Sequence, residues 1–584
     1  MEHLSNLLSS LDISRPSQNL RFINFDPHHA FTRHLNSEHN PAFWYCQSLI
    51  TTALLTYSFY FSVTKIRSVL TNYRRSKSDP AAAESFLLRY DVEPFDIIKD
   101  EHYYFALEYV AKLFRPKWLI HPVHFTDLRW YPWKTDTSAE RPFTVTKTYR
   151  EIINAKFKSG IIPNGRLNFA NLYSEIFVYC RKIIHDIKNG VLTTYPDSIQ
   201  MHVKPSLVKA DEPDKVRSVW GVPKYFIFCE AMFFWPLFSH YFTVKDTPLL
   251  WNYESLNGGW SRLNTEYYAK YSDYKPVFNI DWSEYDMRVY FSMWQDILDQ
   301  VKTYFCFCGK YCPTTLYPDP KTDPSRLHNL WNWLATGYFK MKCASPLGKV
   351  YERLFAGMPS GIFCTQFFDS FYNGVMLICC LRALNHPIPE DFFMKLMGDD
   401  ALFGLLVNIP VSQWADFLEQ LSAEALRRFN ARLSTTKCKI APSIQGASVL
   451  GYSNWNGWPV RDEEELLARL LHPKTLRDTP SRLMARCIGI YFASCGSKRI
   501  RHVTKHIYDE LKHQGHIPTT KGLASLYDPI GIRLTDEDLQ HFPSETEVIA
   551  RLLRPSARAP ELQAAYWNRD HFIFEAGIAQ HDFA

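Results

Sequence analysis

The sequence predicts a mixed α+β fold of several subdomains, in which a small antiparallel sheet carries acidic side chains. The 584 residues exceed the size of a single hydrophobic core. Apolar residues flank Met397-Gly398-Asp399-Asp400 on both sides, which indicates a hairpin whose glycine supplies the tight turn. After Tyr452 the chain becomes mainly helical, with apolar stripes at helical spacing. A sheet in the middle of the chain and a helical subdomain after it are therefore expected.

Composition sets wide limits on partners. The net charge is +6 with a pI near 8.5, which excludes a highly basic coat-like protein but allows an internal basic channel for nucleic acid. Thirteen cysteines without regular spacing, and no signal peptide ahead of them, indicate a reducing, cytosolic setting. Cys306, Cys308 and Cys312, with Cys343 further on, suggest zinc, but the usual Cys-x-x-Cys pairs are missing, so we expect small semi-buried thiols.

The N-terminal part contains two features that bear on partners. Residues 1 to about 40 are polar and are expected to form an arm that follows a surface. The stretch from Asn40 to Thr64 contains no charged residue, but Thr and Ser interrupt it, so we expect a helix buried on a larger protein rather than a membrane span. Between Arg74 and Gln200, helical segments with many aromatic and basic residues suit either a wall for nucleic acid or ordinary core.

The acidic residues suit a site for divalent metal ions. Val277–Ile280 has the pattern of a buried strand, and Asp281 stands where it ends. Two carboxylates held close together repel each other unless a hard cation such as Mg²⁺ neutralises them. Asp281 and Asp399 are the natural ligands of a two-metal site for phosphoryl transfer. Asp286 lies beyond the turn and is better placed to meet a sugar hydroxyl.

A loop and a helix precede the acidic pair. The loop ends at Ser360-Gly361, and the apolar run from Ile362 to Leu381 is expected to be a helix N-capped by Ser360. Thr365, Asp369 and Asn373 are spaced four apart and therefore share one face of it. A ribose with its 2′-hydroxyl would satisfy such a polar stripe, and so would neighbouring protein groups.

Basic residues flank these motifs on both sides. Lys204, Lys209, Lys215 and Arg217 recur within a short stretch, and the alternation of Lys215 with Arg217 suits a strand that directs two cations at a triphosphate. A solvated charged face is the alternative. Downstream, Lys437 and Lys439 are both candidates to protonate a departing pyrophosphate.

The C-terminal helices begin and end at recognisable signals. Asp462 precedes three glutamates and a leucine stripe that runs to Leu471, as expected of a capped amphipathic helix. A second stripe from Arg501 to Gln514 stops at Gly515, where a helix C-cap is expected.

The order of these motifs resembles a known family. A basic strand, Asp-x4-Asp, Ser-Gly-x3-Thr, Gly-Asp-Asp and Lys follow one another as motifs F, A, B, C and D do in viral RNA-directed RNA polymerases, over residues 204 to 455. The chain is similar in particular to the polymerases of partitiviruses, whose genomes are bisegmented double-stranded RNA. Val449–Tyr452 is similar to the start of motif E. The resemblance implies a right-hand fold with an antiparallel-sheet palm, mixed fingers and a helical thumb.

The resemblance also implies boundaries and roles. The expected parts are an N-terminal extension (1–75), fingers (76–276), palm with motif A (277–292), a fingers insertion (293–345), palm with motifs B to E (346–455) and a helical thumb (456–584). Metal would be bound by Asp281 and Asp399 with help from Asp400, and Lys437 would act as the acid. The nucleotide would be bound by Lys209, Lys215, Arg217, Asp286, Ser360, Gly361, Thr365 and Asn373.

The same resemblance implies cofactors, partners and place of action. Mg²⁺, with Mn²⁺ as a substitute, would serve an enzyme that copies viral RNA in transcription and genome replication. RNA template and product, NTPs and the viral capsid protein would be its partners, in the virion interior and the host cytoplasm, without a membrane.

One departure and two alternative functions remain at this point. Many plus-strand RNA virus polymerases have Asn four residues after the motif B Thr, where this chain has Asp369, so either Asp369 or Asn373 could select the ribose. A reverse transcriptase usually has an aromatic residue where Met397 stands and lacks the Ser-Gly-x3-Thr loop. A non-catalytic RNA-binding protein would not need an acidic pair.

Overall fold

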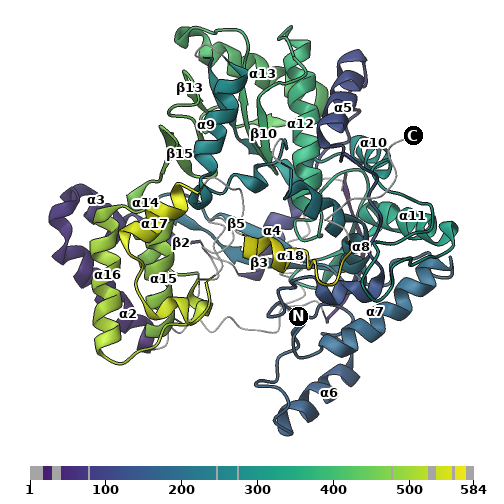
Figure 1. Ribbon diagram of the computed structural model, residues 1–584, viewed down its shortest axis with the longest axis horizontal. Coiled ribbons are helices and arrows are strands. Elements are labelled where there is room, and N and C mark those ends of the chain that lie inside the picture. The colour runs from purple at the N-terminus through teal and green to yellow at the C-terminus, as the bar shows by residue number, and fades with distance from the viewer. Residues whose placement is uncertain are drawn as a thin grey trace, which may run out of the picture.

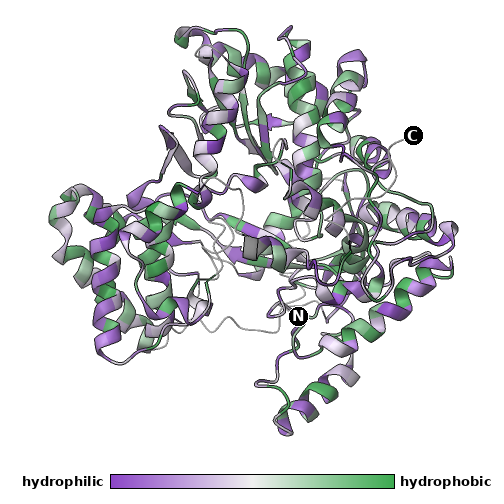
Figure 2. Cartoon of the chain, in the orientation of Figure 1, coloured by the Kyte–Doolittle hydropathy of each residue, from purple (hydrophilic) through white to green (hydrophobic). Residues whose placement is uncertain are grey.

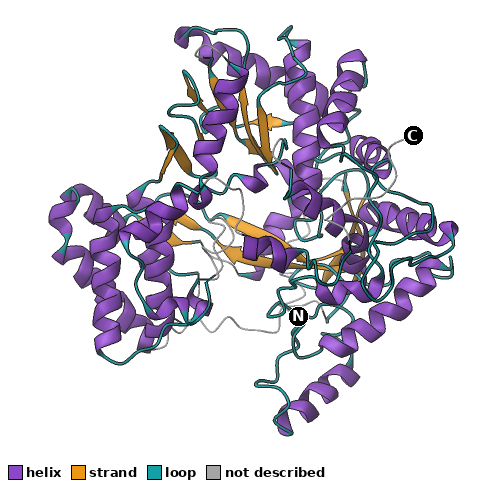
Figure 3. Cartoon of the chain, in the orientation of Figure 1, coloured by secondary structure: helices purple, strands orange, loops and turns teal. Residues whose placement is uncertain are grey.

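The computed structural model describes residues 18–28, 41–76, 79–244, 247–271, 275–474, 478–523, 534–554 and 560–573. Most of the predicted polar arm lies outside these residues. Strands gather in two places, a sheet near the top of the view and a second sheet below it, and helices surround both (Figure 1, Figure 3). The hydrophobic core forms two clusters, one around these sheets and one in the C-terminal helices, as expected of a chain with several subdomains.

The central sheet is antiparallel and has the strand order β10-β11-β6-β13. Strand β6 is Val277–Ile280, as predicted, and all four of its residues are buried. Strands β10 (Met394–Met397) and β11 (Asp400–Gly404) form the predicted hairpin, with Met397 opposite Asp400 and Gly398 at φ +66°. Since the left-handed conformation is costly for residues with a Cβ, glycine suits this turn. Strand β13 (Lys439–Ala441) completes the sheet.

Helix α12 packs on this sheet and is the most buried helix near it. It spans Thr365–Ala383, and the side chains from Phe367 to Leu381 are buried. Its Phe371 lies 4.8 Å from Phe114 of α5 (Glu101–Phe114), measured between ring centroids. Helix α13 (Trp414–Phe429) places Phe417 4.7 Å from Phe278 of β6. Smaller strands complete this region: β7 (Trp282–Ser283), β12 (Arg432–Leu433), β14 (Ser448–Val449), β15 (Tyr452–Trp455) and β16 (Trp458–Val460).

The second sheet has the order β1-β9-β8-β3-β5. Strand β5 (Val216–Gly221) is antiparallel to β3 (Ile199–Pro205), with Arg217 opposite Lys204. The other strands are β1 (Leu20–Phe25), β8 (Cys343–Ala344) and β9 (Lys349–Arg353), and β2 (Tyr73–Arg75) pairs with β4 (Leu207–Lys209) nearby. The helices on this side of the molecule are α4 (Pro80–Leu88), α6 (Lys147–Lys158), α7 (Tyr173–Lys188), α8 (Lys224–Tyr241), α10 (Phe291–Lys302) and α11 (Pro324–Lys340). Helix α9 (Gly259–Lys270) lies beside the central sheet (Figure 1), where the rings of Tyr267 and Phe393 are 5.6 Å apart.

A helical bundle follows the sheets. Helix α14 (Glu463–Leu471) begins after Asp462, which accepts a hydrogen bond from the Glu464 amide, and α16 (Lys498–His513) ends before Gly515, as predicted. Helices α15 (Pro480–Ala493) and α17 (Glu545–Leu552) complete the bundle. Hydrophilic residues follow the outer helix α16 (Figure 2), whereas α15 is almost entirely buried.

The first two described helices join this bundle. Helices α2 (Pro41–Thr56) and α3 (Val63–Thr71) lie beside α14 and α16 (Figure 1), and Ser68 donates a 2.6 Å hydrogen bond to Glu464. One face of α2 is buried against the bundle through Cys46, Ile50 and Leu54, while Trp44 and Leu55 on its other side are exposed. Among the residues that the structure describes, no helix is both long enough and apolar enough to cross a bilayer.

The structure differs from the sequence expectations in three places. Residues 41–71 pack on the bundle, and β1 belongs to the second sheet, so the described residues of the expected N-terminal extension (1–75) pack against the other parts of the fold. Helix α18 (Pro560–Tyr566) and the segment after it leave the bundle and pack on α8, where the rings of Trp567 and Trp235 lie 5.2 Å apart. Helix α12 begins at Thr365 and not at Ser360, because the Ser360 hydroxyl is bonded to Asp286 instead.

A buried ion pair stabilises the bundle. Asp478 and Arg486 form a double hydrogen bond of 3.0 and 2.7 Å, and the Asp478 side chain is fully buried. Asp478→Ala would leave the guanidinium buried without its counter-charge, so the free energy of unfolding should fall by about 3–5 kcal/mol. The measurement is urea unfolding followed by circular dichroism.

The control for this prediction is an exposed pair on α16. Asp509→Ala removes the partner of Lys505 at the surface and should cost less than about 0.5 kcal/mol. Equal losses in the two variants would mean that the buried pair contributes no more than a surface one.

Candidate active site

Three carboxylates meet at one edge of the central sheet. Ile280 pairs with Ala401 at the last position of the β6–β11 ladder, so Asp281 and Asp400, the next residue on each side, leave the sheet at the same edge. Asp399 occupies the hairpin turn itself. Strand register therefore brings Asp281 toward Asp400, and the hairpin turn places Asp399 next to Asp400.

The electrostatics of this group favour a cation. Burial, followed by the negative charges of Asp399 and Asp281, raises the pKa of Asp400 to about 7. Burial also raises the pKa of Asp399, with a further contribution from Asp281. Carboxylate oxygens are the ligands that hard divalent ions prefer, and such an ion removes the repulsion that raises these pKa values. The residues present thus fit a divalent metal ion.

Asn373 connects the elements that carry the carboxylates. Its Nδ2 donates to the carbonyl oxygens of Gly398 and Asp399 at 3.0 and 2.9 Å, and its Oδ1 accepts 2.9 Å from the indole of Trp282, the residue after Asp281. The side chain is fully buried. Both N–H groups and the carbonyl oxygen are used within the protein, which differs from the predicted contact with a nucleotide.

The neighbouring Ser370 supports the same turn. Its Oγ accepts a 2.8 Å hydrogen bond from the Gly398 amide and donates to the carbonyl of Gln366. Sequence analysis missed this residue, because its partner lies on a distant hairpin and nothing in the local pattern distinguishes this serine from any other in a buried helix.

Asp369 differs from the other members of the polar stripe. It is buried, and its Oδ1 has no hydrogen-bond partner within the described part of the chain. Its surroundings are acidic: burial raises its pKa well above the ordinary value, and Asp286 and Asp399 add to this. A buried polar atom without a partner is unusual in a native protein and often marks the place of a bound group.

Asp286 and Ser360 form a pair beside this carboxyl. The Ser360 hydroxyl donates to Asp286, while burial and Asp399 raise the pKa of Asp286 to about 6. The Thr365 hydroxyl donates to the carbonyls of Pro359 and Ile362 at 3.2 and 3.0 Å, so it shapes the loop that presents Ser360.

Close packing fixes this loop against β5. The Trp220 amide donates to the Ser360 carbonyl at 3.3 Å, and a Cβ on Gly361 would overlap the carbonyl of Trp220. Glu230 of α8 accepts from the amides of Phe363 and Cys364 at 2.8 and 3.3 Å. Glu230 was missed by sequence analysis, although a single acid inside the apolar run 225–235 was a usable signal.

Three basic side chains, Lys215, Arg217 and Lys437, border the carboxylates, and a fourth, Lys474, lies near Arg217. The pKa of Lys215 is lowered, first by burial and then by the positive charges of Arg217 and Lys437. The negative charges of Asp281 and Asp399 partly oppose this effect, so all of these side chains lie near one another. The Lys437 Nζ lies 3.8 Å from Asp281. Lys474, after α14, was not predicted; burial and then Arg75, Lys204, Arg469 and Arg217 lower its pKa.

The remaining two predicted lysines lie differently. Lys209 is exposed at the end of β4, where its amide donates to Glu212, and it pairs across the strands with Tyr73. Lys439 is the first residue of β13 and pairs with Asn279, whereas Lys437 lies in the turn just before this strand. Because the Ser434 amide donates to the Asp281 carbonyl at 2.8 Å, the turn with Lys437 is anchored at the carboxylates.

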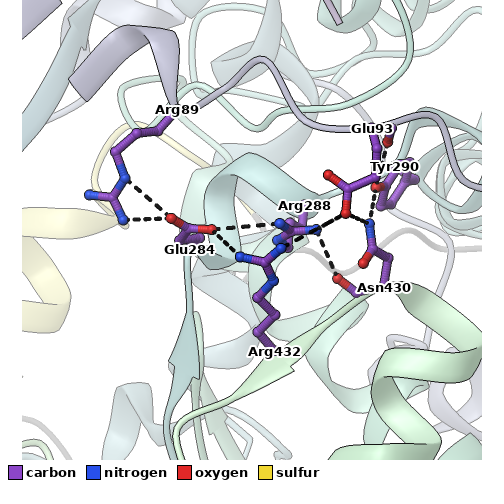
Figure 4. Close-up of polar contacts among 7 residues, drawn as sticks. All are labelled: Arg89, Glu93, Glu284, Arg288, Tyr290, Asn430 and Arg432. Atoms are coloured by element: carbon purple, nitrogen blue, oxygen red, sulfur yellow. Dashed lines mark hydrogen bonds and ion pairs between the residues drawn. The ribbon is translucent and has the colours of Figure 1, made fainter. Parts of the chain in front are cut away.

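An ion-pair network holds the turn between Asp281 and Asp286 from behind (Figure 4). Arg288 is 5% exposed and lies 3.1 Å from Glu93 and 3.6 Å from Glu284. Glu284 has φ +56° and also binds Arg89 at 2.8 Å and Arg432 at 3.3 Å. The network thus joins the turn to the segments before α5 and after α13.

Comparison with known proteins identifies the family. A family model described as viral RNA-dependent RNA polymerase matches residues 124–475, which is more than half of the chain. The chain belongs to this family. The RNA-directed RNA polymerase of White clover cryptic virus 1 is 32% identical over 569 residues, covering 89% of this chain and 91% of the relative. That of Atkinsonella hypoxylon virus is 25% identical over 491 residues, covering 73% and 70%.

The fold is confirmed independently. A solved structure described as Sicinivirus 3Dpol RNA dependent RNA polymerase superposes with a TM-score of 0.58 at 14% identity, covering 92% of this chain and 100% of that one. The resemblance to partitivirus polymerases and the right-hand polymerase fold are therefore both confirmed. The protein is an RNA-directed RNA polymerase and thus a nucleotidyltransferase, which sets aside the reverse transcriptase and the non-catalytic RNA-binding protein. Membership implies an RNA template, NTPs and a divalent metal.

The network in Figure 4 gives a stability prediction for the polymerase. Arg288→Met removes the buried cation while keeping most of its volume. The free energy of unfolding should fall by about 2–3 kcal/mol, less than for a fully enclosed pair because Glu93 is 46% exposed. Nucleotide addition should fall as well, since the turn that carries Asp286 loses its support. Unchanged stability would show that the network contributes nothing.

The pH dependence of unfolding provides a second test. Partial burial acts to raise the pKa of Glu93, but hydrogen bonds from Asn430, the backbone and Arg288 outweigh it and lower the pKa from 4.5 to about 2. The folded state therefore favours the ionised carboxyl, so this stability is present above pH 4.5 and is lost as the pH falls toward 2. In Glu93→Gln the free energy of unfolding should fall less steeply than in wild type as the pH drops from 4.5 to 2. The same pH dependence in both proteins would show that the Glu93 carboxylate does not stabilise the fold.

Proposed function

We propose that the polymerase adds NMPs to the 3′ end of RNA by two-metal nucleotidyl transfer, with Asp281, Asp399 and Asp400 holding Mg²⁺, or Mn²⁺ in its place. The observation that carries this proposal is the set of three carboxylates at the end of two paired strands, where burial and then the neighbouring carboxylates raise the pKa of Asp399 and Asp400. Divalent ions bound there would activate the attacking 3′-hydroxyl and stabilise charge on the reacting phosphate.

The basic residues would bind the triphosphate. Arg217 is a fork-shaped cation that can hold two phosphate oxygens, and Lys215 adds a point charge on the same side. Lys437, beside Asp281, would donate the proton to pyrophosphate, and its position favours it over Lys439. Lys474 and Lys209 would extend the positive field toward the incoming nucleotide.

Sugar selection would depend on Asp286, Ser360 and Asp369. These three groups lie together, and the unpaired Oδ1 of Asp369 supplies the hydrogen-bonding capacity that a ribose 2′-hydroxyl would use. Gly361 and Thr365 would shape the loop that positions Ser360. We assign Asn373 to positioning of the carboxylates rather than to the nucleotide.

The wider role rests on the resemblance to partitivirus polymerases. The enzyme would carry out transcription and genome replication, in association with the viral capsid protein, inside the virion and in the host cytoplasm. In this assignment the central sheet with α12 is the palm, the second sheet and the helices around it are the fingers, and the bundle of α14–α17 with α2 and α3 is the thumb.

The metal assignment predicts the effect of single substitutions. Asp281→Asn and Asp399→Asn each remove one ligand charge without changing volume, so nucleotide addition should fall at least about 10³-fold while the unfolding midpoint stays within a few degrees. Single-turnover extension of a primed RNA measures this. Asp391→Asn, an exposed carboxyl ahead of β10, should be normal. Near-normal turnover of either site variant would refute the assignment.

Sugar choice is tested at Asp369. Asp369→Ala removes a hydrogen-bonding partner that only an rNTP can use, so the preference for rNTP over dNTP should narrow about tenfold, or 1.4 kcal/mol. Asp286→Ala should narrow it as well.

The matched control is Ser370→Ala on the same helix. Because Ser370 holds the Gly398 amide and not the sugar, this variant should slow rNTP and dNTP incorporation alike. If Asp369→Ala leaves the ratio of rNTP to dNTP incorporation unchanged, the contact with the 2′-hydroxyl is made by other groups.

A further inference from the structure

A histidine and two cysteines meet on the side of the fold formed by α8, α10 and α11. The ligand atoms of His121, Cys306 and Cys308 all lie within 4.8 Å of one another. The two sulfur atoms are 2.7 Å apart, and the Cys308 Sγ is 4.0 Å from Nδ1 of His121. His121 and Cys306 are buried and Cys308 is exposed, so the cluster opens to solvent on one side.

The backbone brings these residues together. Ile120 donates to the carbonyl of Tyr304 at 2.9 Å and accepts from the amide of Cys306 at 2.9 Å. On the other side of His121, the Cys312 amide donates to the carbonyl of Pro122 at 2.8 Å. The loop that contains Cys308 is therefore fastened on both sides of His121, which keeps the imidazole next to the two thiols.

The donor set matches a particular metal ion. Imidazole nitrogen together with thiolate sulfur is a combination that zinc binds, at about 2.0–2.1 Å for nitrogen and 2.3 Å for sulfur. Two such Zn–S bonds in a tetrahedral arrangement separate the sulfur atoms by roughly 3.8 Å. Opening the pair by about an ångström is feasible because Cys308 is at the surface and Cys306 alone is enclosed.

The other nearby cysteines have different roles. The Cys312 thiol is buried and donates to the backbone carbonyl of His121 at 3.0 Å, so it supports the histidine from behind. Cys343 is in β8 of the second sheet and is not part of the cluster. From sequence, the four cysteines were expected to be small semi-buried thiols, with zinc as the alternative. The cluster contains two of these cysteines and a histidine 185 positions before Cys306, which no spacing rule could have indicated.

We propose that His121, Cys306 and Cys308 bind one zinc ion, with the fourth position open to solvent beside Cys308. The ion fastens the loop between α10 and α11 to the segment after α5. Its role is structural, because binding that occurs only in the folded chain adds to the stability of that chain.

Metal content of the full-length protein tests the site. The protein is purified in zinc-containing medium without chelator, dialysed, and analysed by plasma mass spectrometry. Wild type should contain about one zinc ion per chain, because three protein ligands, two of them thiolates, retain it at neutral pH. Cys308→Ser and His121→Ala should lose it. Zinc absent from wild type, or retained in Cys308→Ser, overturns the proposal.

The matched control is Cys312→Ser, whose hydroxyl can still donate to the His121 carbonyl. It should keep its zinc, and loss of zinc in this variant overturns the three-ligand assignment. A chelator should lower the unfolding midpoint of wild type and of Cys312→Ser but not that of Cys308→Ser, which keeps the test valid if one variant folds poorly. Alkylation of the denatured, unreduced protein should modify both Cys306 and Cys308, whereas a disulfide between them overturns the proposal.

Discussion

The buried carboxamide of Asn373 is the contact on which the active site depends. One side chain on α12 binds the backbone at Gly398 and Asp399 and also the indole of Trp282, so the hairpin and the end of β6 are held to the same helix. Strand register alone fixes Asp281 relative to Asp400, but Asp399 lies in a turn that register does not constrain. Asn373 and Ser370 supply that constraint.

The active site brings together buried carboxyl groups that repel one another, and neighbouring basic side chains and packing contacts offset this repulsion. The acidic group at the end of the strands and the buried Asp286 and Asp369 would destabilise an isolated sheet, as their raised pKa values indicate. Lys215, Arg217 and Lys437 lie near them, while the buried side chains of Arg288 and Glu230 hold the adjoining turn and loop. A functional site that is itself unfavourable for folding is expected to be supported by stabilising contacts in the surrounding structure.

Sequence periodicity predicted the elements that depend on local pattern. The strand 277–280, the hairpin at Gly398 and the helices beginning after Asp462 and ending before Gly515 all follow from apolar spacing, turn chemistry or capping. It failed where a polar group finds a distant partner. Ser360 was expected to cap a helix, but Asp286 is 74 positions away and takes its hydroxyl. Two further contacts depend on tertiary structure and leave no local pattern in the sequence. These are the packing of α2 and α3 on the bundle and the position of His121 beside Cys308.

Manganese binding in the absence of nucleotide tests the role of Asn373 most directly, because it separates the carboxylates from the substrate. Titration of the free enzyme with Mn²⁺, followed by electron paramagnetic resonance, should show binding about tenfold weaker in Asn373→Ala than in wild type, a loss of about 1.4 kcal/mol. Asp369→Ala should bind Mn²⁺ as tightly as wild type. If Asn373→Ala binds Mn²⁺ normally and only its KM for NTP rises, then the carboxamide serves the nucleotide and does not hold the carboxylates in place.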